Sequence, residues 1–442
     1  MKKLLCIAFI SIVCLAAATA TVSAGEYDLA SYLALVDKNN PDLLVKFKDI
    51  DSAKSDVALA RSAFLPRANL QGGYTRNFRD QLQSYPVASL PGGGSLVWQD
   101  IRTNFDNELS LGIGVSQVLL NAGAISNYNK AKLAQAIREQ SYEAARQAIL
   151  CAAKKLYASA QLTQLVIEIR ESSERLSLEQ YQRVERRNQA GASTELDLLQ
   201  AEVDHRTKID AVTEAKKNNE LVLLAFRDLA GIPHSETVTL TEEHTGLPGI
   251  PVTPDLNNIL AGRADYRALS LSRDISGIDR NAARNAFVPQ IAASFNWSLG
   301  GMGNGSDFTT GYNYNLASLG VFVSIPILTG GERLARMDAA KAAQEKSIIA
   351  LSQKETAIES ELMGLQLRLE DAKQQSESSL QTVETARRAL ALAQTAYTNG
   401  QATYLNVMDA QDKADLVWLN FANLTFEYLS AYYDWELATG VK

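Results

Sequence analysis

The chain has 442 residues, and 43 Lys and Arg against 50 Asp and Glu give it a net charge of −7. This acidic balance gives no reason to expect a nucleic-acid partner. The three cysteines exclude a disulfide framework, because Cys6 and Cys14 lie in a segment that we expect to be removed, which leaves Cys151 alone.

Residues 1–24 have the pattern of a secretory signal peptide. Two lysines precede an apolar run over residues 4–18, and Val22-Ser23-Ala24 offers small residues for cleavage, which we place after Ala24. Loss of the two lysines changes the net charge from −7 to −9. No other stretch is apolar over the roughly 18 residues that a transmembrane helix needs. We therefore expect an exported protein without a transmembrane helix.

The first half of the mature chain predicts a helix, two strands and two further helices. A helix over 27–63 ends before Pro66, which cannot continue it. Two stretches then alternate apolar and polar residues with a period of two, which indicates strands. We expect the strands over 67–78 and 105–118. A long helix over 124–190 follows, without Gly or Pro and roughly 100 Å long at about 1.5 Å per residue, and a shorter helix covers 195–229.

The second half repeats this plan after a linker over 232–254. We expect a helix over 255–286, strands over 290–299 and 312–326, a long helix over 332–398 and a helix over 404–437. Four short matches recur in the same order at an offset of 208 to 223 residues: Ala63–Pro66 with Ala286–Pro289, Leu111–Ser116 with Leu319–Ser324, Gly191–Leu198 with Gly400–Val407, and Leu229–Gly231 with Ala438–Gly440. They indicate an internal two-fold repeat, with 25–231 as the first copy and 255–442 as the second. Convergent helix composition is the alternative.

The predicted strands suit an outer membrane. The loops that join each pair, 84–95 and 300–311, are long and rich in Gly, Ser and Pro, whereas the other strand ends run straight into helices. Four strands cannot close a barrel, and an open edge in hydrocarbon leaves backbone groups unsatisfied, so several copies would be required. A soluble sandwich is the alternative. Aromatic residues near the predicted strand ends suit a membrane interface: Tyr74, Phe78, Phe105, Trp297, Tyr312 and Tyr314.

Taken together, these features resemble the TolC family of outer-membrane efflux proteins over nearly all of the mature chain. The N-terminal motif Asn39–Leu43, its second-half echo Ala264–Arg267 and two Gly-x-x-Thr-x-Leu turns carry the likeness. The resemblance implies a homotrimer whose fold is mainly α with a β membrane part. Each protomer would contribute four strands to a trimeric 12-stranded transmembrane β-barrel. Its long antiparallel helices would form an α-barrel tunnel of twelve helices through the periplasm.

The resemblance also implies a function and partners. The protein would be a passive exit duct in the cell outer membrane with a periplasmic extension, surrounded by outer-membrane lipid. A periplasmic adaptor protein would couple it to an inner-membrane pump of the resistance-nodulation-division, ABC or major facilitator type, in an efflux or type I secretion system. A periplasmic coiled-coil adaptor or scaffold is the alternative. Adaptors, however, end their hairpin in small soluble β domains, which the alternating strands do not resemble.

Two turns, at 191–195 and 399–403, are implied by the resemblance to form a periplasmic tip that docks the adaptor. Gly191 and Gly400 would provide the backbone freedom that ends each long helix, and Thr194 and Thr403 the oxygen that caps the next. Helix-hairpin turns without a docking role are the alternative. The docking candidates are Gly191, Thr194, Leu196, Gly400, Thr403 and Leu405.

The family closes its tunnel near this tip, and matching positions give the gate candidates Asp197, Tyr397, Asn406 and Asp409. The sequence departs from the best-known members at Asn406, where they carry a carboxylate, and at Ala402, where they carry an arginine. A three-copy ring at Asp409 would favour cations, whereas a ring at position 406 would be neutral. Ordinary exposed helix aspartates are the alternative.

No residues indicate enzyme chemistry. The three histidines, His205, His234 and His244, lack the spacing of a metal site or a catalytic triad. The glycine-rich run at 300–305 leads into another strand and not into a helix N-terminus that could receive a phosphate. We therefore expect no catalytic site, no metal and no cofactor.

Overall fold

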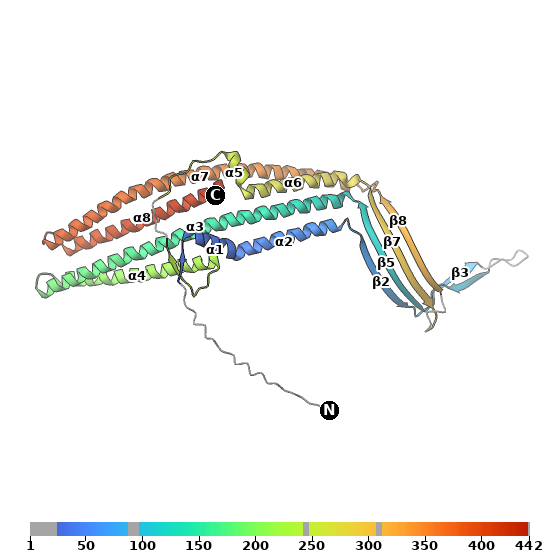
Figure 1. The fold of residues 1–442 in the computed structure, drawn as a ribbon, viewed down its shortest axis with the longest axis horizontal. Helices are drawn as coiled ribbons and strands as arrows, with labels where there is room; N and C mark the ends of the chain where they lie inside the picture. The colour runs from blue at the N-terminus through green and yellow to red at the C-terminus, as the bar shows by residue number, and fades with distance from the viewer. Residues whose placement is uncertain (1–23, 87–96, 242–246, 306–311, 441–442) are drawn as a thin grey trace, which may run out of the picture. The chain divides into compact units, whose positions relative to one another are not determined.

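The computed structural model describes residues 24–86, 97–241, 247–305 and 312–440 (Figure 1). The expected signal peptide therefore lies almost wholly outside the described residues, as do parts of the two predicted loops. The chain divides into two compact units. We call residues 46–143 and 264–357 the sheet unit, and the described residues of 1–45, 144–263 and 358–442 the helical unit. Each unit takes segments from both halves of the sequence.

A four-stranded antiparallel sheet dominates the sheet unit (Figure 1). Its strands are β2 (Arg67–Arg76), β5 (Asn107–Leu120), β7 (Gln290–Gly303) and β8 (Tyr312–Ser324), in the order β2-β5-β7-β8. The two strands of the first half thus pair directly with those of the second. Because β2 and β8 each have one neighbour in the sheet, the sheet has two open edges.

The register of the strands places the apolar residues of the sheet on one face. Leu70 lies opposite Ile113, Ile113 opposite Trp297, and Trp297 opposite Ala317. Residues directly opposite each other point to the same face. The predicted apolar phase of all four strands is therefore confirmed. The apolar face carries Leu70, Leu109, Leu111, Ile113, Val115, Ile291, Phe295, Trp297, Leu299, Leu319, Val321 and Val323.

The opposite face of the sheet is mainly polar. Leu316 and Phe322 are large apolar exceptions on it. Its polar residues include Asn69, Gln71, Thr75, Ser110, Ser116, Ser294, Asn296, Ser298 and Ser318. The apolar face is exposed within one protomer, where Leu70 is 70 % exposed and Leu319 is 79 % exposed. An exposed apolar surface of this kind indicates contact with lipid or with another protein chain.

Strand β7 continues to Gly303, beyond the predicted end at residue 299. Trp297 therefore lies in the middle of the strand, and its predicted place at a strand end is wrong. Residues 300–303 pair with β5 on one side and 300–302 with β8 on the other, although they look like a loop in the sequence. Gly300 is needed there, since a Cβ atom would lie 2.5 Å from the Tyr314 ring and 2.6 Å from the Leu109 carbonyl oxygen.

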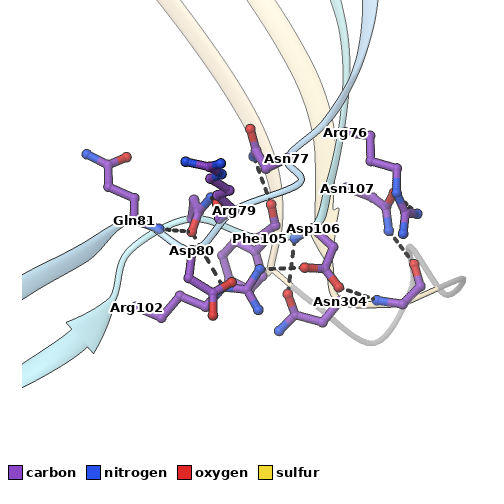
Figure 2. A network of polar contacts seen from close by, with 12 residues as sticks. Arg76, Asn77, Arg79, Asp80, Gln81, Arg102, Phe105, Asp106, Asn107 and Asn304 are labelled. Carbon is purple, nitrogen blue, oxygen red and sulfur yellow. Dashed lines mark hydrogen bonds and ion pairs between the residues drawn. The ribbon is translucent and has the colours of Figure 1, made fainter.

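A short hairpin occupies part of the segment that was expected to be a loop after β2. Strand β3 (Leu82–Pro86) pairs antiparallel with β4 (Trp98–Arg102). A two-stranded hairpin is marginally stable by itself, so its attachment to the sheet matters. Figure 2 shows the polar network at its base.

This network joins the hairpin to β5 and to the end of β7. The Arg102 guanidinium lies 3.0 Å from an Asp80 carboxylate oxygen and 2.5 Å from one of Asp106. Asp106 in turn accepts a hydrogen bond from the Gly305 amide (3.0 Å), while its own amide donates to Asn304 Oδ1 (3.1 Å; Figure 2). The hairpin is thus fixed to the rim of the sheet on the side away from α2.

Two long helices run through both units. Helix α3 (Ala122–Gln189) has 68 residues and α7 (Glu332–Thr398) has 67, so each is roughly 100 Å long. The shorter helices are α1 (Leu29–Asn39), α2 (Pro41–Ser62), α4 (Glu195–Ala230), α5 (Leu256–Gly262), α6 (Ala264–Arg284), the 3₁₀ turn η1 (Asn285–Phe287) and α8 (Tyr404–Thr439). No helix among the described residues is both long and apolar enough to cross a bilayer.

Two helices that were predicted as continuous are broken. The helix predicted over 27–63 stops at Asn40, whose side-chain oxygen accepts from the amides of Asp42 (3.0 Å) and Leu43 (3.1 Å) and so starts α2, with Pro41 in its first turn. The helix predicted over 255–286 breaks at Arg263, which adopts an extended backbone and donates to Glu361 Oε2 at 2.7 Å. Side-chain hydrogen bonds accompany both breaks, and the spacing of apolar residues in the sequence gives no sign of them.

The linker predicted over 232–254 contains a strand, β6 (Thr237–Leu240), which pairs in parallel with β1 (Ala24–Tyr27). Next to this pair lies the main core of the helical unit. Tyr32 stacks on Phe226 with ring centroids 3.7 Å apart, and Tyr157 packs against both rings. All three side chains are almost fully buried, so the core joins α1, α3 and α4.

Candidate functional site

The helical unit ends in two hairpin turns with the same backbone geometry. Gly191 follows α3 with φ 72°, and Gly400 follows α7 with φ 73°. In each turn, the residue after the glycine donates its amide proton to a carbonyl of the preceding helix, at 2.8 Å. Left-handed φ favours glycine at these positions. The predicted helix-ending role of both glycines is confirmed, and their docking role stays a prediction.

The next helices are capped in two different ways. At the start of α4, the Asp197 amide donates to Thr194 Oγ1 (3.1 Å), and the Thr194 amide donates to Asp197 Oδ2 (3.2 Å). At the start of α8, the Thr403 amide and hydroxyl both donate to Asn406 Oδ1, at 3.0 and 2.7 Å. Thr194 is thus the capping oxygen that was predicted. At the second turn, the bonding oxygen belongs to Asn406.

Thr194→Ala is expected to weaken the first turn of α4 by about 1 kcal/mol, because it removes a capping acceptor. The measurement is hydrogen exchange at the Asp197 amide, which should become faster. Thr403→Ala is the matched control and should change exchange at residue 406 less, because the Thr403 hydroxyl donates there. Equal effects in both turns would contradict this assignment.

The four gate candidates lie on three helices, and each has partners within one protomer. Asp197 belongs to the α4 cap, and Asn406 to the α8 cap. Tyr397 is buried in a cluster with Val184, Ala201, Tyr404 and Val407, and the Arg187 guanidinium lies 4.9 Å from its ring centroid. Asp409 forms an exposed ion pair with Lys413 at 2.7 Å. The positive charge of Arg187 also helps to lower the pKa of Asp197, so Asp197 and Tyr397 share one neighbour. The gating role of all four candidates stays a prediction.

The hydrogen bonds of the cap also affect Asp197. Burial alone would raise the pKa of this carboxyl, but the hydrogen bonds from Thr194 and Ser193 outweigh it and hold the pKa below its ordinary value. A lowered pKa means that the carboxylate stabilises the folded turn at neutral pH and that this stabilisation is lost as the pH falls below about 4.

A buried polar network that we did not predict lies behind the tip. The Lys208 side chain of α4 is 9 % exposed, and its ammonium lies 2.6 Å from Asp412 Oδ1 and 3.2 Å from Asp415 Oδ2, both on α8. From α3, the Ser173 hydroxyl donates to Asp415, and the Ser173 carbonyl accepts from Gln411 Nε2 at 3.1 Å. We call these five residues the Lys208 clasp. It links α3, α4 and α8.

Burial and charge compete at the clasp. Burial opposes the charged ammonium, but hydrogen bonds and charges from Asp412 and Asp415 outweigh it and raise the pKa of Lys208. Next to the clasp, burial raises the pKa of Asp204. Asp204 also accepts a 3.4 Å hydrogen bond from Tyr404, whose own pKa is raised mainly by burial. The Lys208 ammonium therefore interacts with three carboxylates, those of Asp204, Asp412 and Asp415, in a site that is partly shielded from water.

The described residues contain no group of three or more His, Cys, Asp and Glu side chains placed to hold a metal ion. Of the histidines, His205 lies close to Ser177, with Nδ1 3.2 Å from the hydroxyl oxygen, and stacks on Tyr181.

Residues 33–230 and 256–441 match the family model described as outer membrane efflux protein. The outer membrane protein TolC of Vibrio cholerae is 23 % identical over 450 residues, covering 100 % of this chain and 96 % of that protein. The alkaline protease secretion protein AprF of Pseudomonas aeruginosa is 22 % identical over 414 residues, covering 93 % and 83 %.

Solved structures agree on the fold. The crystal structure of the Campylobacter jejuni CmeC outer membrane channel superposes with a TM-score of 0.74 at 18 % sequence identity, covering 93 % of this chain and 85 % of that chain. At this identity, the likeness concerns the fold alone.

Proposed function

This chain belongs to the outer membrane efflux protein family, and we propose that three copies of it form the exit duct of an export system in the outer membrane. The observation that carries this proposal is the sheet, which has one apolar face and two open edges. Such a sheet cannot stand alone in hydrocarbon, because its edge N–H and C=O groups would lack partners.

Closure by copies of the same chain solves this problem. If the β8 edge of one protomer pairs with the β2 edge of the next, three protomers build a closed barrel of twelve strands. The apolar face then lies against lipid, and the polar face lines the lumen. The resemblance between the two halves, in which α3 matches α7 and α4 matches α8 in length, fits an internal duplication that gives the barrel wall a repeating unit.

The helices extend the duct into the periplasm, and the turns at Gly191 and Gly400 form its tip. There the duct docks a periplasmic adaptor protein that couples it to an inner-membrane pump. Leu196 and Leu405 support a docking role, because they are 63 % and 52 % exposed next to the two turns. The gate lies close by, at Asp197, Tyr397, Asn406 and Asp409. The pump and the adaptor select the cargo, and the duct is passive.

The test is to express the full chain and to fractionate the membranes. We expect a trimer in the outer-membrane fraction that dissociates on heating in detergent and that forms ion-conducting channels in planar bilayers. A water-soluble periplasmic monomer without channel activity would refute the duct and favour the adaptor or scaffold alternative.

A further inference from the structure

A cavity of about 500 Å³ lies in the sheet unit, where the strands meet the helices. Its wall is formed by the N-terminal turns of α3 and α7, the C-terminal turn of α6, η1 and the first residue of β7. Most of the lining side chains are small or uncharged. The charged ones are Glu332, Arg333 and Arg336, which leave one positive charge in excess.

Arg333 supplies this excess positive charge, although most of the residue is buried and it forms no ion pair among the described residues. Its residue is 8 % exposed, and among the described residues its guanidinium has no hydrogen-bond acceptor and no carboxylate partner. Its close neighbour is the Phe287 ring, whose centroid lies 4.7 Å away. Arg336, by contrast, is exposed and pairs with Glu332 at 2.5 Å. The Arg333 nitrogens are not among the fully buried polar atoms that lack a partner, so they reach water. An anion in the cavity can replace that water as the partner of the guanidinium.

Two helix N-termini add to the positive potential. The first-turn N–H groups of a helix lack intrahelical acceptors and attract anions. In α3, Asn121 Oδ1 accepts from the Ala124 amide (3.1 Å) and thus caps part of this turn. The C-terminal turn of α6 carries a partial negative charge and so reduces the positive potential of the cavity. Arg333 is therefore the main source of positive potential in the cavity, and the N-termini of α3 and α7 add a smaller part.

Exposed apolar side chains lie in the segments that border the cavity. Ile327 and Leu328, in the segment between β8 and α7, are 93 % and 91 % exposed, and Ile325 is 55 % exposed. Phe287, whose ring contacts Arg333, is 53 % exposed. A ligand that matches this surface would have an anionic group that pairs with Arg333. It would also have apolar chains that cover these exposed side chains.

We propose that this cavity binds the phosphate of a phospholipid headgroup, with Arg333 as the main ligand and the acyl chains against Ile325, Ile327 and Leu328. The proposal rests on the proposed function, which places the helix-bearing end of the sheet at the periplasmic surface of the outer membrane. Arginine suits this ligand, because its planar guanidinium can donate two parallel hydrogen bonds to phosphate oxygens. The lipid would then brace the junction between strands and helices.

The test uses the full-length trimer, stripped of lipid by detergent exchange. Binding is measured by native mass spectrometry for three probes: dioctanoyl phosphatidylglycerol, dioctanoylglycerol, which lacks the phosphate, and inorganic phosphate. We expect wild type to prefer the phospholipid to both other probes. Arg333→Met should weaken its binding about tenfold or more, which is the loss expected for a charge-assisted hydrogen bond. Arg333→Lys keeps the positive charge but loses the two parallel hydrogen bonds, so its binding should lie between those of wild type and Arg333→Met.

The matched control is Arg388→Met, which removes an exposed arginine of the same helix that pairs with Glu384 at 3.0 Å. It should leave phospholipid binding unchanged. Equal phospholipid binding by wild type and Arg333→Met would overturn the proposal, as would phosphate binding without any gain from the acyl chains. These results differ from failure of the proposed function, which would appear earlier as a wild-type protein that forms no trimer and no channel.

Discussion

Lys208→Met is expected to raise the single-channel conductance of the trimer, because it removes the ammonium that holds α4 to α8 behind the periplasmic tip. Lys208 is buried, and its two partners on α8 lie at 2.6 and 3.2 Å. Loss of one partner from a buried ion pair costs about 3–5 kcal/mol. Since Asp412 is half exposed, we expect about 3 kcal/mol, measured as a lower midpoint of denaturant unfolding alongside the higher conductance.

Lys413→Met is the matched control for this substitution. Lys413 lies on α8, close to the clasp, and its ion pair with Asp409 is exposed and stays within one helix. Exposed pairs of this kind contribute well under about 1 kcal/mol. We therefore expect nearly unchanged stability and at most a small change in conductance. If both substitutions have the same effect, or if Lys208→Met leaves the conductance unchanged, the clasp does not hold the tip closed.

The clasp also predicts an alkaline transition. Because the pKa of Lys208 is raised in the folded protein, its stabilisation is fully present below the ordinary lysine pKa of about 10.4 and is lost as the pH rises above it. The wild-type channel should therefore lose its low-conductance state at strongly alkaline pH, and Lys208→Met should lack this step.

The clasp shows why part of the site could not be predicted from the sequence. Asp412 and Asp415 are three residues apart, which places them on one face of α8, and this much can be read from the sequence. Their partner Lys208, however, lies about 200 residues earlier, and only the relative register of α4 and α8 brings the three groups together. Motif matching identified Asn406 and Ala402 as departures from the family but gave no sign of a buried lysine behind them.

The sheet was easier to predict because its signal is local. Alternation along a strand fixes which side chains share a face, and so the apolar phase of Leu111 and Phe295 was correct from the sequence. The extension of β7 through Gly300 was missed, since glycine indicates a loop unless the close approach of Tyr314 is known. The hairpin of β3 and β4 was missed because its base is held to the sheet by the Arg102–Asp106 ion pair and by hydrogen bonds of Asp106 to Gly305 and Asn304, which no local pattern reveals.

Leu111→Arg is expected to prevent assembly of the membrane part, because it places a guanidinium on the apolar face in the middle of the sheet. Leu111 lies opposite Gly72 on one side and Leu299 on the other, and is 41 % exposed. An arginine that faces lipid near the bilayer midplane costs about 2–4 kcal/mol, and the trimer would pay this three times. The expected result is loss of the heat-modifiable trimer from the outer-membrane fraction.

Ser110→Arg gives the matched control, because it places the same charge one residue earlier in β5, on the polar face. If that face lines the lumen, the substitution should preserve the trimer and instead reduce the preference for cations, since three arginines would project into the water-filled interior. The measurement is the reversal potential in a salt gradient. Loss of the trimer with Ser110→Arg and tolerance of Leu111→Arg would reverse the assignment of the two faces. If both substitutions are tolerated, neither face of the sheet lies against lipid, and the proposed transmembrane barrel is wrong.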